Sequence, residues 1–431
     1  MRPRIEEFQD YIPRLFPAEG KKVRCVTVQV TDACNLRCTY CYQLCKQEHV
    51  IRAETAEAFL EQLLTDRSPY ISRANTSGMI LDLIGGEPLL AAERMEEIVE
   101  WTIRRMIELD HPWLFRFRVS ISSNGTLYFR PEVRRFLQRY RPWISFSISI
   151  DGDETLHDRC RVFPDGRGSY GLAVAAAKHW RAGGGELGSK MTLCPNNVAY
   201  TARALENLVE LGYRSIFCNC VFEEGWTAEH GRALYHQMAE LTDWLEARGL
   251  LDEVYISLFE DGLFRPLPPE DDQNWCGGTG DMIAVDWKGD VYPCLRYMES
   301  SLGGQAAPLR IGTAAGGVEQ TQEQRETVDC LRCITRRSQS TEECWVCPIA
   351  KGCAWCSAYN YQTFGTPDRR ATFICVMHRA RALGNLYFWA KHRRATGETN
   401  AMENHVPEEW GVELLGAEEW TKLKSLATEP S

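Results

Sequence analysis

The sequence lacks any run of about 18 apolar residues, the length that a helix needs to cross a membrane. It also lacks an amino-terminal apolar segment with a small-residue cleavage site, because charges are scattered through its start, MRPRIEEFQDYIPRLF. Acidic residues outnumber basic ones and give a net charge of −10, which is not typical of a nucleic-acid-binding surface. We therefore expect a cytoplasmic protein that binds neither membrane nor nucleic acid.

Cysteine, by contrast, is abundant, with 18 in 431 residues. A large protein of the reducing cytoplasm gains little from disulfides, so dense cysteine indicates metal, iron–sulfur or thiol chemistry. Three cysteines fall within residues 34–41 and nine lie between Cys276 and Cys375, which predicts two metal-bearing regions. The others are expected to be ordinary strand or loop residues: Cys25, Cys45, Cys160, Cys194, Cys218 and Cys220.

Residues 23–223 alternate short β-branched runs with segments of helical periodicity. Six such units predict a parallel sheet covered by helices, fewer than the eight units of a closed barrel. We therefore expect an α/β fold, an open partial barrel that binds its ligands at the carboxyl ends of the strands. The expected strands are residues 23–32, 79–87, 117–125, 144–152, 189–195 and 214–222.

A stretch dense in proline and acid, FRPLPPEDDQNW, marks an expected domain boundary at residues 264–275. Residues 276–375 show little periodicity, so we expect that bound metal is needed to stabilise their fold. Residues 378–393 are expected to form a helix. The predicted division is an amino-terminal extension (1–22), a core (23–263), a small, irregular cysteine-rich domain (264–385), and a C-terminal helix and tail (386–431).

The first cysteine group, in TDACNLRCTYCY, places Cys34, Cys38 and Cys41 in C-x3-C-x2-C spacing after the first expected strand. Three thiolates on one tight loop can hold three irons of a 4Fe–4S cluster and leave the fourth iron open. A structural zinc site is the alternative, with Cys45 or His49 as its fourth ligand. The position at a strand end and the aromatic residue before the third cysteine favour the cluster.

This loop resembles the signature of the radical S-adenosylmethionine (SAM) superfamily, and residues 23–223 resemble its partial (β/α)6 barrel. The resemblance implies that SAM chelates the open iron and that Cys34, Cys38 and Cys41 are the catalytic cluster ligands. It also implies that the reduced cluster cleaves SAM to a 5′-deoxyadenosyl radical, which takes a hydrogen atom from the substrate. A reducing partner such as flavodoxin or ferredoxin is then expected.

Further residues resemble SAM-binding positions of that superfamily. The motif Gly85–Pro88 resembles GGEP, in which glycines allow close backbone approach and a carboxylate receives an ammonium group. The segment around Asp151 resembles S-x-D-G…H-D-x-x-R, which implies that Arg161 pairs with the SAM carboxylate, while His157 is expected to be structural. The residues expected to contact SAM are Tyr40, Gly85, Gly86, Glu87, Pro88, Ser122, Asn124, Ser149, Asp151, Arg161 and Lys190.

Simpler interpretations remain open for several of these residues. The glycine motif also fits a plain strand-to-helix turn, and short side chains such as Ser122 and Asn124 are common turn formers. A lone arginine such as Arg161 is most often a surface residue. Lys190 is a second candidate for the SAM carboxylate.

The second cysteine group resembles the SPASM domain, which binds two auxiliary 4Fe–4S clusters in enzymes that modify ribosomally made peptides and proteins. With the first cluster, this implies three 4Fe–4S clusters in all. The resemblance implies one cluster held by Cys344, Cys347, Cys353 and Cys375, and a nearer one held by Cys276, Cys294 and Cys356. The chain departs from the family at Cys353–Cys356, which are spaced C-x2-C where C-x3-C is usual, and this puts Cys356 in doubt.

The nearer cluster is one ligand short. Either it has an open iron, or Cys330 or Cys333 completes it. The alternative is a four-cysteine zinc ribbon made of Cys330, Cys333, Cys344 and Cys347, which would leave the later cysteines without a role.

Leu295 stands where the sulfatase-maturing members of that family have an aspartate, which disfavours oxidation of serine or cysteine. The segment CPIAKGCAWCSAYNYQTFG resembles maturases of peptides with repeated C-x-x-x units, and also ranthipeptide and sactipeptide synthases. The expected reaction is thioether cross-linking of a Cys-rich precursor peptide. Rival predictions are peptide epimerisation, carbon–carbon cross-linking, or a redox carrier or zinc-stapled binding protein without SAM chemistry.

About 22 residues precede the first expected strand, which is too short for the winged-helix element that grips leader peptides in related enzymes. Leader recognition is therefore expected from a separate small protein or from the acidic tail.

Overall fold

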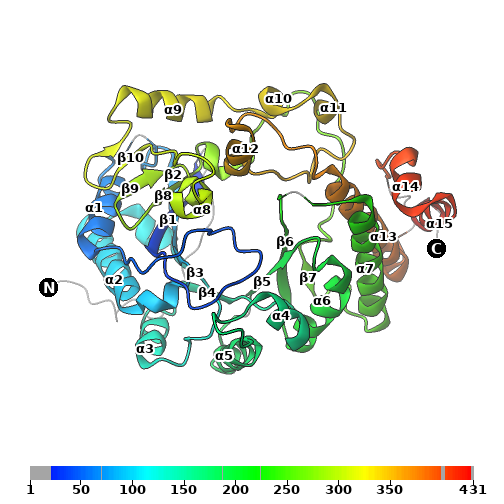
Figure 1. The fold of residues 1–431 in the computed structure, drawn as a ribbon, viewed down its shortest axis with the longest axis horizontal. Helices are drawn as coiled ribbons and strands as arrows, with labels where there is room; N and C mark the ends of the chain where they lie inside the picture. The colour runs from blue at the N-terminus through cyan, green and yellow to red at the C-terminus, as the bar shows by residue number, and fades with distance from the viewer. Residues whose placement is uncertain (1–20, 69, 187, 224, 399–402, 429–431) are drawn as a thin grey trace.

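The computed structural model describes residues 21–68, 70–186, 188–223, 225–398 and 403–428. Its centre is an 11-stranded sheet in the order β11-β10-β9-β8-β1-β2-β3-β4-β5-β6-β7 (Figure 1). The strands from β1 to β7 are all parallel, and the six strands expected from the sequence are confirmed. They are β1 (Lys22–Thr31), β2 (Thr76–Gly85), β3 (Phe117–Ser123), β4 (Ile144–Ile148), β5 (Gly188–Leu193) and β6 (Ser215–Cys220), followed by the short β7 (Tyr255–Ile256).

Helices cover the outer face of this curved sheet, as the β–α alternation predicts (Figure 1). Val119 and Ile121 of β3 are buried, whereas Ser120 and Ser122, each next to Ile121, are more accessible. Because strand side chains alternate, this pattern gives the sheet an apolar outer face and a polar inner face. The covering helices are α1 (Ala53–Leu64), α2 (Ala92–Glu108), α3 (Pro131–Arg139), α4 (Glu154–Cys160), α5 (Tyr170–Ala182), α6 (Thr201–Glu210) and α7 (Ala228–Ala247).

The cysteine-rich region extends the same sheet beyond β1. β8 (Met282–Val285) pairs in parallel with β1, and β9 (Asp290–Tyr292) pairs antiparallel with β8. Two further short strands, β10 (Gly312–Thr313) and β11 (Gly317–Val318), complete that edge. The sequence did not predict these strands, because runs of two to four residues are too short to show a period.

The rest of that region consists of short helices: α8 (Glu299–Leu302), α9 (Gln322–Arg332), α10 (Arg336–Gln339), α11 (Glu342–Trp345) and α12 (Ser357–Phe364). The predicted helix at residues 378–393 is confirmed within α13 (Cys375–Thr396), which packs along α7. The tail forms α14 (Glu408–Leu415) and α15 (Ala417–Thr428), which lie beside α13 (Figure 1). Trp420 of α15 joins a small core with Leu383 of α13.

Most of the predicted amino-terminal extension, residues 1–20, lies outside the described residues. Among the described helices, none combines the length and the apolar character that crossing a bilayer requires.

Candidate active site

The loop with the first three cysteines leaves the carboxyl end of β1 and lies against the end of β2. The backbone N–H of Glu87 donates to the carbonyl of Ala33 at 2.8 Å, and that of Gly86 donates to Thr31 at 3.2 Å. A Cβ on Gly86 would lie only 2.4 Å from the Ala33 carbonyl oxygen. The glycine is therefore needed for the close approach of the cysteine loop, while Pro88 begins a 3-10 turn.

Glu87 is 1% exposed, and its carboxylate is surrounded by donors of the protein itself. It accepts hydrogen bonds from the Ser123 hydroxyl at 2.7 Å, the Asn124 backbone N–H at 2.8 Å and the Leu89 backbone N–H at 3.1 Å. Burial raises the pKa of Glu87, and these hydrogen bonds partly oppose that rise. The carboxylate expected to receive the SAM ammonium thus first ties the end of β2 to the end of β3.

Ser123, which contacts Glu87, was missed by the sequence reasoning, which selected its neighbour Ser122. Successive strand residues point to opposite faces, so the Ser122 hydroxyl instead lies 3.0 Å from that of Ser147 on β4. The alternation of buried and accessible residues along β3 was the available signal.

An amide network connects the cysteine loop to the end of β3. The Asn124 side-chain amide donates to the Asn35 side-chain oxygen at 2.9 Å, and Asn35 donates to the Thr126 hydroxyl at 2.8 Å. Thr126 in turn donates to the Asn124 side-chain oxygen at 2.7 Å. Asn35 lies directly after Cys34, so this closed ring of hydrogen bonds fixes the loop at its first cysteine. Asn35 and Thr126 were not predicted, because amides in loops carry no spacing signal.

Arg161 is buried and paired with Asp151, whose side chain is fully buried. Its Nε lies 2.8 Å from the Asp151 carboxylate, and the Tyr40 hydroxyl donates to the same carboxylate. The Arg161 guanidinium also lies over the Tyr40 ring, 5.4 Å from its centroid. The guanidinium expected to pair with SAM therefore already holds Asp151, and Tyr40 joins this buried pair to the cysteine loop.

His157 supports the Asp151–Arg161 pair through the backbone of Asp151. Its Nδ1 accepts from the Asp151 backbone N–H at 3.2 Å, and its Nε2 lies 3.0 Å from the Ser169 hydroxyl. Burial, together with the nearby Arg161, lowers the pKa of His157 to about 4. The ring is therefore neutral at pH 7 and acts as a structural support, the role expected of it.

Of two further predicted contacts, Lys190 lies apart from this cluster of strand ends, whereas Ser149 is bonded to it. Lys190 is exposed on the inner face of β5, three residues before the strand ends, and is therefore deeper than the loop residues. Burial raises the pKa of Asp82, while the Ser120 hydroxyl and Lys190 lower it, so Lys190 faces Asp82 across the sheet. The backbone N–H of Ser149 donates to Ser123 at 2.9 Å.

The thiols of the cysteine loop are half-buried, and burial raises the pKa of Cys34 to about 11 and that of Cys38 above its usual value. Thiolates at such positions require a bound cation. Three thiols on a loop of eight residues, fixed by buried hydrogen bonds, fit a 4Fe–4S cluster with one open iron. In the described part of the chain, no three Cys, His, Asp or Glu side chains converge on a point for one metal ion. Thiols that bind different irons of a cluster do not need to converge on one point.

The alternative zinc ligands of this loop are engaged or turned outward. The Nδ1 atom of His49 lies 2.8 Å from the Asp32 carboxylate, and its ring stacks on Trp287 with centroids 3.6 Å apart. Cys45 is exposed. His49 thus connects the cysteine loop to the β8–β9 turn instead of joining the three thiols.

The later cysteines fall into two spatial groups. Burial raises the pKa of Cys294, and the nearby Cys356 and Cys276 raise it further. The Cys276 thiol also lies 3.1 Å from the Ser357 hydroxyl, directly after Cys356. The structure therefore brings Cys276, Cys294 and Cys356 together, despite the shortened spacing at Cys356.

The second of these groups lies around Cys353. Burial raises the pKa of Cys353 to about 12, and the neighbouring thiols of Cys375, Cys347 and Cys344 contribute to the rise. Its four members are thus the four predicted for the distal cluster. Cys330 and Cys333 join neither group, because both are exposed on the outer side of α9 while Leu331 between them is buried.

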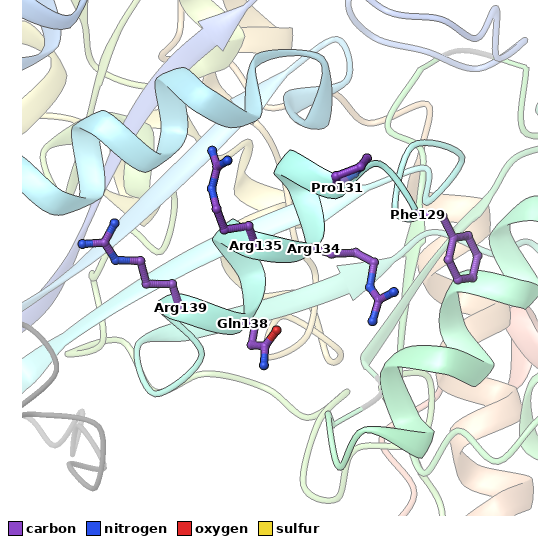
Figure 2. Close-up of a pocket in the computed structure, with 6 residues that line it drawn as sticks. All are labelled: Phe129, Pro131, Arg134, Arg135, Gln138 and Arg139. Atoms are coloured by element: carbon purple, nitrogen blue, oxygen red, sulfur yellow. The ribbon is translucent and has the colours of Figure 1, made fainter.

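An arginine-rich depression of about 540 Å³ lies away from all the cysteines, on the outer surface of α3. Figure 2 shows Arg134 extending toward Phe129, while Arg135 and Arg139 extend to the other side. Arg135 and Arg139 both lie within ion-pair distance of Glu96, at 2.9 and 3.4 Å. These arginines stabilise the contact between α2 and α3 and form no part of the candidate active site.

Comparison with solved structures gives the same fold over most of the chain. The structure "Native anSMEcpe with bound AdoMet and Cp18Cys peptide" matches with a TM-score of 0.62 and 18% identity, covering 86% of this chain and 98% of that one. "Streptococcus suis SuiB bound to precursor peptide SuiA" matches with a TM-score of 0.53 and 14% identity, covering 85% and 78%.

Relatives in sequence match over smaller parts of the chain. An uncharacterized protein of Methanocaldococcus jannaschii is 24% identical over 62% of this chain and 83% of its own length. The Fe-coproporphyrin III synthase of Methanosarcina barkeri is 23% identical over 40% of this chain and 38% of its own. The model of the family described as "Radical SAM superfamily" matches residues 28–230, which span the cysteine loop and the strands β2–β6. Residues 28–230 of the chain therefore form a radical SAM domain.

Proposed function

We propose that this chain is a SPASM-type radical SAM maturase that forms thioether cross-links in a Cys-rich precursor peptide. The grouping of the auxiliary thiols is the observation that carries this proposal. One group has four thiols, that of Cys353 and its three neighbours, but only three, those of Cys276, Cys294 and Cys356, form the other group. A three-thiol site leaves one iron of a 4Fe–4S cluster without a protein ligand.

An open iron in that group suits a substrate thiolate, because soft sulfur ligands are preferred at iron–sulfur centres. The outward position of Cys330 and Cys333 supports this, since neither is placed to supply a fourth thiolate. For each thioether, one carbon-bound hydrogen atom of the peptide passes to the 5′-deoxyadenosyl radical and one thiol proton is released. The remaining electron would pass to the iron–sulfur cluster that Cys276, Cys294 and Cys356 would hold.

When bound, SAM and the reduced cluster of the first loop supply the 5′-deoxyadenosyl radical. The protein's own contribution is to hold that loop rigid at the mouth of the barrel. Glu87, Asn35 and Asn124 fix its backbone, and the Asp151–Arg161 pair fixes Tyr40. The remaining N–H groups of Arg161, and Lys190 deeper in the barrel, are the cations proposed to bind the SAM carboxylate.

The fold supports a peptide substrate. Solved structures with this fold include one with AdoMet and the Cp18Cys peptide, and one with the precursor peptide SuiA. We propose cytoplasmic action, a separate leader-recognition protein, and flavodoxin or ferredoxin as electron donor. The proposed domains stay at residues 23–263 and 264–385, with β8 joining the second to the sheet of the first.

The test is anaerobic reconstitution with iron and sulfide, followed by incubation with SAM, dithionite and a Cys-rich peptide encoded beside this chain. A mass loss of two hydrogens per link, with cysteines that no longer react with iodoacetamide, is expected. Loss of two hydrogens with free thiols would indicate carbon–carbon cross-linking, and an unchanged mass with inverted α-carbons would indicate epimerisation. Protein without 5′-deoxyadenosine production would contradict SAM chemistry altogether.

A further inference from the structure

A cavity of about 350 Å³ lies between the end of the barrel and the cysteine-rich region. Its walls come from the segment after β7, the residues around Cys276, the loop 351–355 and helix α13. Because Cys276 lines the cavity, the cavity is next to the three-thiol group. The charged and indole side chains of the lining are Glu260, Trp275, Lys351, Trp355 and Arg381.

The cavity holds two cations that the protein leaves without a carboxylate. Among the described residues, neither Lys351 nor Arg381 forms an ion pair, and the buried Nε atom of Arg381 has no hydrogen-bond partner. Glu260 is the one carboxylate in the lining, and it accepts a hydrogen bond from the Tyr255 hydroxyl. A cation that lines a cavity without a carboxylate partner is available to pair with an anionic ligand.

The other walls are apolar and accessible from outside. Trp275 is 48% exposed, and Trp355 lines the cavity between two predicted cluster ligands, Cys353 and Cys356. A volume of about 350 Å³ lies at the low end of the range of ligand pockets, and it suits one side chain or chain end with its neighbouring backbone. Two indole rings beside two cations fit a group with an apolar stem and an anionic end.

We propose that this cavity binds a peptide carboxylate, from an acidic side chain or from the chain's C-terminus, and so anchors the substrate beside Cys276. The inference rests on the proposed function, because it takes the substrate to be a peptide. Arg381 binds the carboxylate through its guanidinium, with Lys351 as the second cation. The anchor presents neighbouring residues of the peptide to the three-thiol group.

The test measures binding alone, by fluorescence anisotropy, with the full chain carrying its reconstituted clusters. The probes are three fluorescein-labelled Gly/Ser decapeptides: one with a single Glu and an amidated end, one with Gln and an amidated end, and one with Gln and a free C-terminal carboxylate. We expect at least one carboxylate peptide to bind about tenfold or more tightly than the amidated Gln peptide. The peptide that binds identifies the source of the carboxylate.

The variants Arg381→Gln and Lys351→Gln are expected to remove that preference, and Lys178→Gln on the exposed face of α5 is the matched control. Arg381→Lys keeps the charge and is expected to retain part of the preference, which separates ligand binding from a folding defect. Equal binding of all three peptides, or an unchanged preference in both Gln variants, overturns the proposal.

The two proposals fail separately. If peptides bind through a carboxylate but no thioether forms, the cavity assignment stands and the proposed function falls. If thioethers form but carboxylate and amide peptides bind alike, the cavity assignment falls and the proposed function stands.

Discussion

The two cysteine-bearing regions of this molecule are built in opposite ways. The first has three thiols within eight residues, on one loop between two long parallel strands. The second gathers seven thiols from a stretch of 100 residues, Cys276–Cys375, in which the elements are short. In the first region the chain's covalent spacing places the thiols, whereas in the second the tertiary structure must do so.

The support behind the thiols differs as well. Behind the first loop lie buried carboxylates with several donors each, such as Glu87 and Asp151, just beyond the ends of strands with a large apolar core. Behind the second lie a small cluster around Tyr297 and Leu331, and isolated contacts such as Arg336 over Trp345 at 3.9 Å. We infer that the barrel is stable without metal and that the cysteine-rich region depends on metal.

The largest expected effect comes from the first loop. Cys34→Ala removes one of three cluster ligands and is expected to lower 5′-deoxyadenosine production by about 1000-fold or more, because SAM then has no cluster to bind. Chromatographic assay of 5′-deoxyadenosine measures the loss. Cys45→Ala, four residues beyond the loop and exposed, is the control and should leave production unchanged. Equal activity of the two variants would contradict the assignment of the first loop.

A second substitution separates the two regions. Cys356→Ala is expected to lower iron by about four atoms per chain and to abolish peptide modification, while SAM cleavage continues. Iron analysis and product mass spectrometry measure the two effects. The exposed Cys330→Ala is the matched control and should retain full iron. Loss of iron in the Cys330 variant would instead make it the missing fourth ligand.

Loss of the buried Arg161–Asp151 pair at the barrel mouth is expected to lower the stability of the protein strongly. Arg161→Met leaves the fully buried Asp151 carboxylate without its cation and should lower the free energy of unfolding by about 3–5 kcal/mol. Thermal unfolding checks this. Arg167→Met breaks an exposed pair with Asp165 and should leave the melting temperature unchanged. Similar melting temperatures for the two variants would show that the Arg161–Asp151 pair contributes little to the stability of the protein.

The smallest expected effect concerns pH. The pKa of His157 is lowered from an ordinary 6.5 to about 4, so the unfolded chain binds the proton more tightly than the folded protein does. Stability from this residue is therefore present above about pH 6.5 and is lost as the pH falls toward 4. Urea unfolding of His157→Gln across this window should show a shallower decline than the parent protein. Parallel declines would contradict a buried neutral ring.

Several elements of the fold and site follow from the sequence, and several do not. The six long strands are visible because apolar runs and helical periods alternate over 200 residues. The short strands β8–β11 were not predicted, because two to four residues show no period. Their stability comes from pairing, of β8 with β1 and of β9, β10 and β11 each with the strand before it. Ser122 was predicted to be a site residue instead of Ser123. The choice between these neighbours depends on which face of β3 is buried.

The sequence by itself determined the first cysteine loop, because the spacing of Cys34, Cys38 and Cys41 limits how far apart three thiols can lie. Only the tertiary structure decided that Arg161 holds Asp151, that Cys356 joins Cys276 and Cys294, and that Cys330 faces outward. The physical reason is that covalent spacing restricts distances over a few residues only. Beyond that range, strand register and packing select which side chains meet.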